Sequence, residues 1–315
     1  MGRENRSGSG KDTKSVKLEK KISRFFLENM GSCPVRIERC AVGQGNYVYI
    51  IETHGGKYVF RLSEETDAYK DTVYWLEKLA DLDIPVPKVL GKGILEGYEY
   101  VILSYFEGKD IGLVYGEIKE QDKRNIAREI VGIQKKMEAL KLENIPMDWC
   151  WKTEIDEMLE RARVRIAQNG YFDTAKVEKV YSLAEELQTY FFGIQPIAYL
   201  DDVSTKNLLI HKGHISGIVD IDWMGVGDKL TYVALTYMAL LNMECDTDYV
   251  TYILEEMKLS AIEEKAFLFY TIMYCVDFMG ERGMQFMDKR IEVNEKIIDR
   301  LNTLYDELIL RWYET

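Results

Sequence analysis

The sequence contains few residues of the types that mark several protein classes. Its 315 residues include 5 cysteines, 5 prolines and 3 histidines. The cysteines are odd in number, widely spaced and without a CxxC pair, which argues against a disulfide framework or zinc knuckle and favours reduced thiols. The three histidines lie in or beside expected turns, so the sequence lacks the residues for a His-based catalytic triad or an HExxH metal site. We expect His54, His211 and His214 at the surface.

Long apolar runs and excess positive charge are also lacking. No apolar run reaches the roughly 18 residues that a membrane-spanning helix needs, and the opening MGRENRSGSGKDTK lacks the apolar core of a signal peptide. Asp and Glu number 53 against 41 Lys and Arg, which gives a net charge of -12. Such a charge repels nucleic acid and anionic membranes but not a cationic ligand. We therefore expect a cytoplasmic protein with neither nucleic acid nor membrane as partner.

The chain does contain enough apolar residues for a sizeable core, at 47%, and its length is typical of two domains or lobes. Residues 35–62 alternate apolar and polar side chains between Gly-bearing turns, which predicts an antiparallel meander. A helix over residues 68–82 and a strand over 98–105 follow. These elements predict a small α+β lobe.

Helical periodicity dominates after Gly108. Apolar residues from Ile126 to Leu140 recur at spacings of four and three, as one buried helix face requires. One hairpin interrupts this pattern, because two apolar runs flank a Lys212-Gly213 turn. Further helices are expected over residues 152–165, over 175–192 and from 230 to the C-terminus.

We predict three parts of the chain, with a ligand site between the two lobes. They are a flexible tail over residues 1–14, an N-terminal lobe over 15–106, and a helical lobe over 107–315 that carries the hairpin region 199–223.

The strongest chemical signal lies around this hairpin, in YLDDVSTKNLLIHKGHISGIVDIDW. Asp202 precedes Asn207 by five positions, and Asp220 lies on the far strand, so two carboxylates and an amide converge at one end of the hairpin. Phosphoryl transfer uses such a set, with one Asp to accept the proton of an attacking hydroxyl and an Asn and an Asp to hold Mg²⁺. The competing interpretation is that these polar residues only cap a turn.

These motifs resemble the aminoglycoside phosphotransferase family, whose core reads HGDxxxxN, then GxIDW, then a GD element, here Gly227-Asp228. The segment GQGNYVYIIETHGGKYVFRL and the YKD at residues 69–71 look closest to the hygromycin B phosphotransferases. The resemblance covers roughly residues 35 to 290 and implies a protein-kinase-like, bilobal α+β fold. It also implies Mg²⁺, with ATP or GTP as phosphoryl donor between the lobes, and a cationic or hydroxyl-bearing small molecule as acceptor under the helical lobe.

The resemblance implies a role for each matching position. Asp202 is the expected catalytic base, and Asn207 and Asp220 are the expected magnesium ligands. The expected nucleotide-binding residues are Gly43 and Gly45 in a phosphate loop, Arg61 on the α/β-phosphates with Asp71 as its acidic partner, and the backbones of Ser104 and Phe106 at adenine.

Two departures leave an alternative open. The usual His-Gly before the catalytic Asp is Leu200-Asp201, and Val48 replaces the third Gly of the phosphate loop. A catalytically inactive nucleotide-binding module is therefore the alternative to an enzyme. In place of the catalytic-loop role of the family's His, the Leu200 side chain could pack in the core. A protein kinase is disfavoured, because no HRD, DFG or APE triplet occurs.

Acidic residues near the C-terminus are the candidates for binding the acceptor. Asp277 and Glu281 lie one helical turn apart, and a cationic amino sugar would need carboxylates there. A solvated helix face is the competing interpretation. The same framework also suits macrolides, choline, homoserine or other metabolites as acceptors, and the fold does not choose among them. A kinase of an aminoglycoside-type antibiotic, and hence an antibiotic-resistance enzyme, is the first expectation, and a kinase of another metabolite or of a macrolide is the alternative.

Overall fold

We describe the protein from a computed structural model. It describes residues 13–40, 46–143, 145–201, 203, 205–221, 224–286 and 289–314. The chain forms two compact units, the smaller made of residues up to Lys70 together with Lys88–Tyr105, and the larger of Asp71–Pro87 together with the residues from Phe106 onward. The predicted α+β fold is confirmed.

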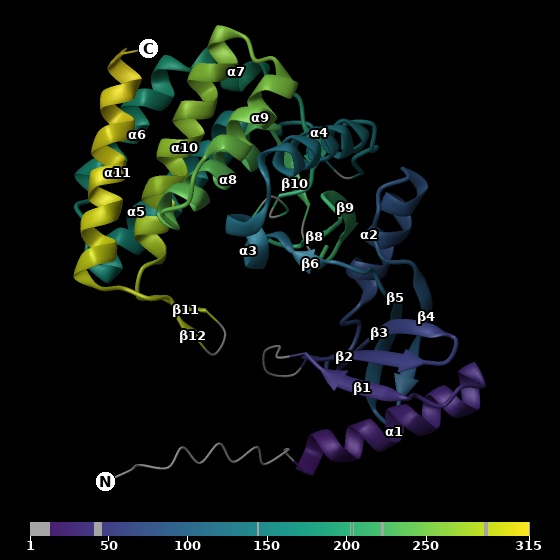
Figure 1. Cartoon of the computed structure of the whole chain (residues 1–315). Helices are drawn as coiled ribbons and strands as arrows, with labels where there is room; N and C mark the ends of the chain where they lie inside the picture. Colours follow the sequence, from purple (N-terminus) through teal and green to yellow (C-terminus); the bar gives the residue numbers. More distant parts are fainter. Residues whose placement is uncertain are drawn as a thin grey trace. The chain divides into compact units, whose positions relative to one another are not determined.

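The smaller unit is a five-stranded antiparallel sheet with one helix against it (Figure 1). The strands lie in the order β1-β2-β3-β5-β4, so the meander expected from the sequence is present. Its elements are α1 (Thr13–Met30), β1 (Arg36–Arg39), β2 (Asn46–Thr53), β3 (Gly56–Ser63), β4 (Val89–Leu95) and β5 (Tyr98–Ser104).

The core of this unit lies between α1 and the sheet. Alternate residues of β2, such as Tyr49 and Ile51, point inward because successive strand side chains face opposite sides. Ile22 and Phe26 of α1 are four positions apart, share one helix face and are fully buried in the same cluster. The sequence analysis assigned no helix to these residues.

The larger unit is mostly helical. Its elements are α2 (Lys70–Asp81), β6 (Lys109–Asp110), α3 (Ile111–Val114), a 3₁₀ turn (Tyr115–Glu117), α4 (Glu120–Met137), α5 (Trp151–Asn169), α6 (Ala175–Glu186), α7 (Gln188–Gly193), β7 (Ile197–Tyr199), β8 (Leu208–His211), β9 (His214–Ile218), β10 (Gly225–Gly227), α8 (Leu230–Asn242), α9 (Asp248–Met257), α10 (Ala261–Glu281), β11 (Gln285–Phe286), β12 (Lys289–Arg290) and α11 (Glu295–Glu314).

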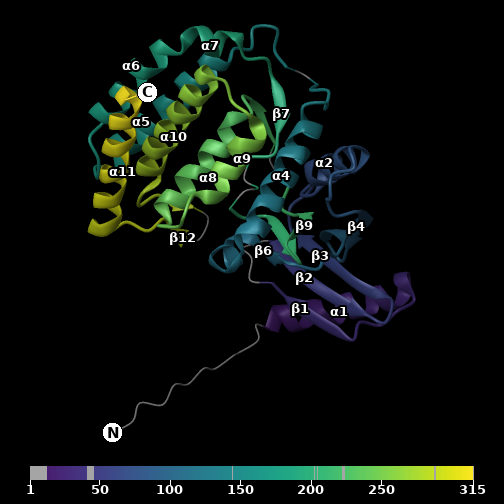
Figure 2. The ribbon, with the colours of Figure 1, turned by 45° about the horizontal axis from the view of Figure 1, so that its top comes forward.

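The helix α10 is the centre of this unit, where it packs against α5, α8 and α11 (Figure 2). Every residue from Ala266 to Val276 is buried, and this stretch is mostly apolar on all sides, as a fully enclosed helix must be. The single helix expected over 175–192 is two helices, since the backbone leaves helical angles at Leu187 while its side chain stays buried. Within the described residues, no helix is long and apolar enough to cross a membrane.

Candidate active site

The hairpin predicted from the sequence is formed by β8 and β9. Its turn is Lys212-Gly213, with both residues at positive φ, which matches the twist of a two-residue hairpin turn. At the opposite end, Leu208 pairs with Ile218, and the Val219 N–H donates to the Asn207 carbonyl at 2.9 Å. This last bond brings Asn207 and Asp220 to the same end of the hairpin.

Both of these polar residues have left-handed backbones, with φ of 64° at Asn207 and 59° at Asp220. Asn and Asp tolerate this conformation better than other residues with a side chain. Asp220 is exposed and Asn207 is half-buried. The local backbone thus turns an amide and a carboxylate out of the ladder at one edge.

A third polar residue, Asp110 at the end of β6, fixes this edge. Its Oδ2 accepts the Asn207 N–H at 2.8 Å, and its Oδ1 accepts the Gly112 N–H at 2.9 Å, so that it caps α3 at the same time. Because β6 also pairs with β8, Asp110 joins the start of α3, the strand β8 and Asn207 through hydrogen bonds. Asp110 was not among the predicted site residues, because an Asp before a short helix is too common a pattern to single out.

Two close contacts explain glycines around the hairpin. A Cβ at Gly217 would lie 2.4 Å from the Phe106 ring, and one at Gly108 would lie 2.7 Å from Ser216 Oγ. No side chain fits at such distances. The chain leading into this unit therefore packs directly on β9.

The GD element forms a buried anchor. Asp228 is 4% exposed, and its Oδ2 accepts hydrogen bonds from the hydroxyls of Tyr190 at 2.7 Å and Tyr270 at 2.8 Å. Tyr270 in turn accepts from the Trp151 indole N–H at 2.7 Å, and Asp228 Oδ1 accepts from the Leu230 N–H. Burial raises the pKa of Asp228, while these hydrogen bonds oppose that shift. The network joins α5, α7, α8 and α10 to β10.

The strand β10, which precedes Asp228, connects this buried network to the segment that precedes Asp202. It pairs with β7 in the register Gly225 to Tyr199, and a Cβ at Gly225 would lie 2.2 Å from the Tyr199 ring. The sequence then runs from Tyr199 through Leu200 and Asp201 to Asp202, which lies outside the described residues. The Leu200 side chain is buried, as one reading of the sequence expected.

The two predicted acceptor carboxylates lie on the last turns of α10 and are partly buried. Asp277 pairs with Arg165 of α5, Nη1 to Oδ1 at 3.1 Å. Burial raises the pKa of Asp277 against the pull of Arg165, and burial together with the charge of Asp277 raises the pKa of Glu281. The competing picture of a fully solvated helix face is therefore too simple for this pair.

The charges of Asp201 and Lys206 contribute to pKa shifts of residues on the last turns of α10. Burial first, and then Tyr199, Asp201 and Asp277, raise the pKa of the buried Tyr274 hydroxyl on α10. Lys206, just before Asn207, favours the charged form of Glu281.

Comparison with known proteins identifies the family. The model of the phosphotransferase enzyme family matches residues 36–253. The chain belongs to this family. This phosphotransferase is 23% identical over 253 residues to an aminoglycoside 3'-phosphotransferase of Niallia circulans. The match covers 78% of this chain and 93% of that relative.

Solved structures share the fold of this phosphotransferase. The aminoglycoside phosphotransferase APH(4)-Ia superposes with a TM-score of 0.62 at 16% identity, covering 92% of this chain and 98% of that one. A thermostable mutant of it was solved as a ternary complex with AMP-PNP and hygromycin B, with a TM-score of 0.61, 16% identity and coverage of 93% and 97%. A candidate fructosamine-3-kinase of Haemophilus somnus gives 0.60 at 16% identity, covering 92% and 97%. The kinase-like fold expected from the sequence is confirmed.

The predicted nucleotide-binding residues are divided between the two units. Arg61 lies on β3, half-buried, with its guanidinium 5.4 Å from the centre of the Tyr69 ring. Ser104 ends β5, where its N–H donates to the Lys88 carbonyl and its Oγ accepts from the Lys88 N–H, both at 2.9 Å. Asp71 is exposed in the first turn of α2, and Phe106 belongs to the larger unit. Gly43 and Gly45 lie outside the described residues. The nucleotide roles stay predictions.

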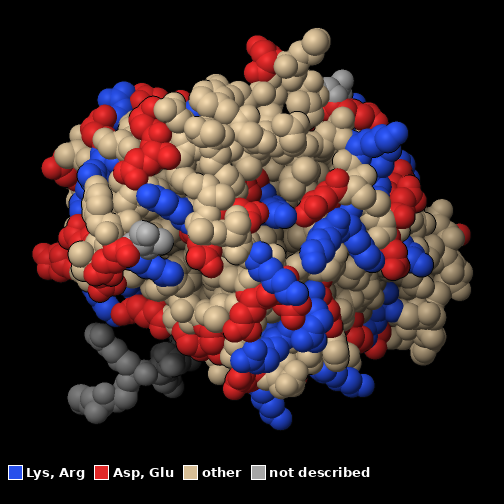
Figure 3. All heavy atoms as spheres, turned by 90° about the horizontal axis from the view of Figure 1, so that it is seen from above, with Lys and Arg blue, Asp and Glu red and all other residues tan. Residues whose placement is uncertain are grey.

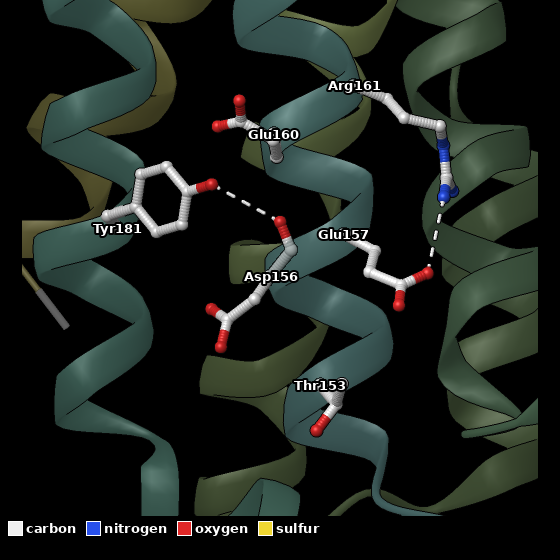
Figure 4. A pocket seen from close by; sticks show the side chains of 6 residues that line it. All are labelled: Thr153, Asp156, Glu157, Glu160, Arg161 and Tyr181. Atoms are coloured by element: carbon white, nitrogen blue, oxygen red, sulfur yellow. Dashed lines mark hydrogen bonds and ion pairs between the residues drawn. The ribbon is translucent and has the colours of Figure 1, made fainter.

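An acidic hollow between α5 and α6 contains none of the predicted site residues (Figure 4). Its volume is about 640 Å³, and its lining includes Asp156, Glu157 and Glu160. These carboxylates face cations of their own helix: Lys152 reaches Asp156 at 2.8 Å and Arg163 reaches Glu160. The hollow therefore offers a comparison site for tests of acceptor binding rather than a second candidate.

The face of the molecule in Figure 3 carries acidic and basic side chains interspersed. The net charge of -12 is thus not gathered into one acidic patch on this face. Attraction of a cationic ligand would have to come from local carboxylates, because exposed charges separated by more than about 8 Å are screened at physiological salt.

Proposed function

We propose that this phosphotransferase transfers the γ-phosphoryl group of ATP to a hydroxyl of an aminoglycoside-type acceptor. The observation that supports this best is the hairpin edge, where Asn207 and Asp220 come together in left-handed conformations. Turn capping alone does not require both residues to leave the ladder at the same edge. ATP as donor is supported by the AMP-PNP complex of APH(4)-Ia.

Asn207 and Asp220 would hold Mg²⁺ through hard oxygen donors. Within the described ranges no group of three or more His, Cys, Asp or Glu could hold a metal ion, so these ranges contain no all-protein cage. A site with two protein ligands suits magnesium, which keeps its other positions for water and phosphate oxygens. When bound, the ion would offset negative charge on the phosphates.

In the proposed reaction, Asp202 accepts the proton of the acceptor hydroxyl. The hydroxyl oxygen forms a bond to the γ-phosphorus while the bond from that phosphorus to the bridging oxygen of ADP breaks, and ADP leaves with the electron pair. Arg61 on the α/β-phosphates would offset charge on the leaving group. Asp71 would orient Arg61, the Gly43–Gly45 loop would cover the phosphates, and the backbones of Ser104 and Phe106 would hold adenine.

The test of phosphoryl transfer is the Asp202→Asn variant. We expect kcat to fall by about 10²- to 10⁴-fold with nucleotide affinity retained, because the change removes the proton acceptor and keeps the shape. Asp83→Asn, an exposed carboxylate paired with Lys136 at 3.2 Å, is the matched control. Turnover is measured by coupled ADP release over a panel of amino-sugar, macrolide and amino-alcohol acceptors. Wild-type turnover in the variant contradicts the role of Asp202.

The test of the acceptor class uses Asp277→Asn and Glu281→Gln. We expect the acceptor KM to rise about tenfold or more with the ATP KM unchanged, because an ion pair between the carboxylate and an amino group of the acceptor is lost from the ground state and the transition state alike. Glu160→Gln, from the hollow in Figure 4, is the control for a general loss of negative charge. If only uncharged or anionic acceptors are phosphorylated, the aminoglycoside class is wrong and a metabolite or macrolide kinase replaces it. If no acceptor is phosphorylated although nucleotide binds, the chain is an inactive nucleotide-binding module.

A further inference from the structure

A polar residue lies on the buried face of α4. Gln134 is 4% exposed, among the apolar residues that pack this helix on its neighbours. Its Nε2 donates to the Leu200 carbonyl at 2.7 Å, and its Oε1 accepts from the Leu200 N–H at 2.9 Å. One side-chain amide therefore satisfies both backbone groups of a single buried residue, as a neighbouring strand would.

Leu200 is the point at which the chain leaves β7. The ladder with β10 ends at Tyr199, one residue earlier, so the backbone of Leu200 relies on Gln134 for the bonds that the ladder no longer supplies. The Leu200 side chain is itself buried and has no polar atom to hold the segment. Further along, the Val203 N–H donates to the Asp201 carbonyl at 2.9 Å, and this bond joins the two residues that flank Asp202 in sequence.

We propose that Gln134 is a positioning residue, which sets the direction of the chain from β7 to Asp202 by holding both backbone groups of Leu200. This inference rests on the proposed function of Asp202. Two bonds to one residue fix the orientation of its peptide groups as well as their position. A displacement of about 1 Å in a reacting group can cost about 100-fold in rate, so a holder of this kind affects kcat without touching substrate.

The first test removes both bonds while keeping the volume, in Gln134→Met. We expect kcat to fall by about 10- to 100-fold and the dissociation constant of Mg²⁺-nucleotide to change by less than about twofold. Hydrogen exchange of the peptide containing Leu200 should become faster. Ile126→Ala, a fully buried position two turns earlier on α4, is the control, because it loosens the helix but removes no bond to Leu200.

The second test is a conservative rescue with its own pH signature, in Gln134→Glu. A neutral carboxylic acid can donate to the Leu200 carbonyl and accept from its N–H, whereas the ionised form has no proton to donate and repels the carbonyl. We expect kcat of this variant to approach the wild-type value at low pH and to fall relative to it as pH rises. A merely space-filling role predicts parallel pH profiles.

The third test places each change in an Asp202→Asn background. If Gln134 acts through Asp202, Gln134→Met should reduce the residual rate much less there than in the wild type. The inference is overturned if Gln134→Met keeps the wild-type kcat per folded molecule, or if Ile126→Ala loses as much. In both cases wild-type turnover leaves the proposed function standing. If the wild type phosphorylates no acceptor, the proposed function fails and the positioning role falls with it.

Discussion

Asp220 and Asp228 are eight positions apart and belong to the same motif region, yet they lie in opposite environments. Asp220 is exposed with a left-handed backbone at the hairpin edge, whereas Asp228 is buried and accepts bonds from two tyrosine hydroxyls. The exposed carboxylate is the one proposed to hold Mg²⁺, whereas the buried one ties four helices to β10. Two aspartates in one motif thus differ in burial and in hydrogen-bond partners, so that substituting them should have different consequences.

The largest effect that would sharpen this comparison is expected from Asp220→Ala. We expect Mg²⁺-nucleotide affinity to fall by about 100-fold or more, because loss of a neighbour that only supports a metal ligand already costs 10- to 100-fold. Alanine at this left-handed backbone also costs about 1 kcal/mol of stability, which Asp220→Asn avoids. Calorimetric titration of both variants measures the affinity. Unchanged affinity in both would remove Asp220 from the metal site.

A smaller effect, on stability rather than ligand binding, is expected from Asp228→Ala. The change leaves two buried hydroxyls and the Leu230 N–H without their acceptor, so the free energy of unfolding should fall by about 2–4 kcal/mol. Tyr190→Phe removes one of these bonds and should cost about 1 kcal/mol. Urea denaturation gives both values, with nucleotide affinity of the folded protein as the control. If the change cost more free energy of nucleotide binding than free energy of unfolding, Asp228 would belong to the nucleotide site, like Asp220.

The smallest effect concerns the turn end of the same hairpin. His214 Nδ1 lies 2.5 Å from Glu129 Oε1 on α4, and the Ile215 N–H donates to Glu129 Oε2. The bond to Glu129 raises the pKa of His214 above its ordinary value of 6.5, with its charge and that of Asp122 adding to the shift. The protonated form therefore stabilises the fold fully below pH 6.5, and this contribution is lost as pH rises through the raised folded-state pKa.

We expect wild type to melt at a higher temperature than His214→Gln near about pH 6, with the difference vanishing at about pH 9. Thermal melting across this pH range measures the difference in melting temperature. In 1 M salt the screening length is about 3 Å, so the bond between His214 and Glu129 should persist, whereas an attraction between more distant charges should be lost. A difference that does not depend on pH would mean that the ring contributes only packing.

Much of the fold was predictable because the spacing of apolar side chains in the sequence agrees with which side chains are buried in the structure. The apolar stripe of α4, the meander of β2 and β3, and the Lys212-Gly213 turn each follow from side-chain spacing or turn chemistry. All three histidines are exposed, as expected. The helix α1 was not predicted, because no clear helix-start or helix-stop residues flank it in the sequence. The break at Leu187 was not predicted either, because the spacing of apolar residues does not change there.

The candidate site was only partly predictable. Asn207 and Asp220 stand in a recognisable motif, and the structure brings them to one edge. Gln134 had one available signal, a polar side chain on an apolar helix face, but such a residue can as easily be a tolerated exception. The pairing of Asp277 with Arg165 had none, because it joins two helices 112 positions apart.

The sequence by itself determined the periodicities, the turn and the order of Asp202, Asn207 and Asp220, since these depend on residues close together in the chain. Only the tertiary structure decided which carboxylates are buried and which backbone groups Gln134 holds. Burial and hydrogen-bond partners arise when distant segments close on one another, so α10 beside α5 gives Asp277 its arginine, and α4 beside β7 gives Leu200 its amide. The cost of leaving such groups without partners in a dry interior keeps those pairings in place.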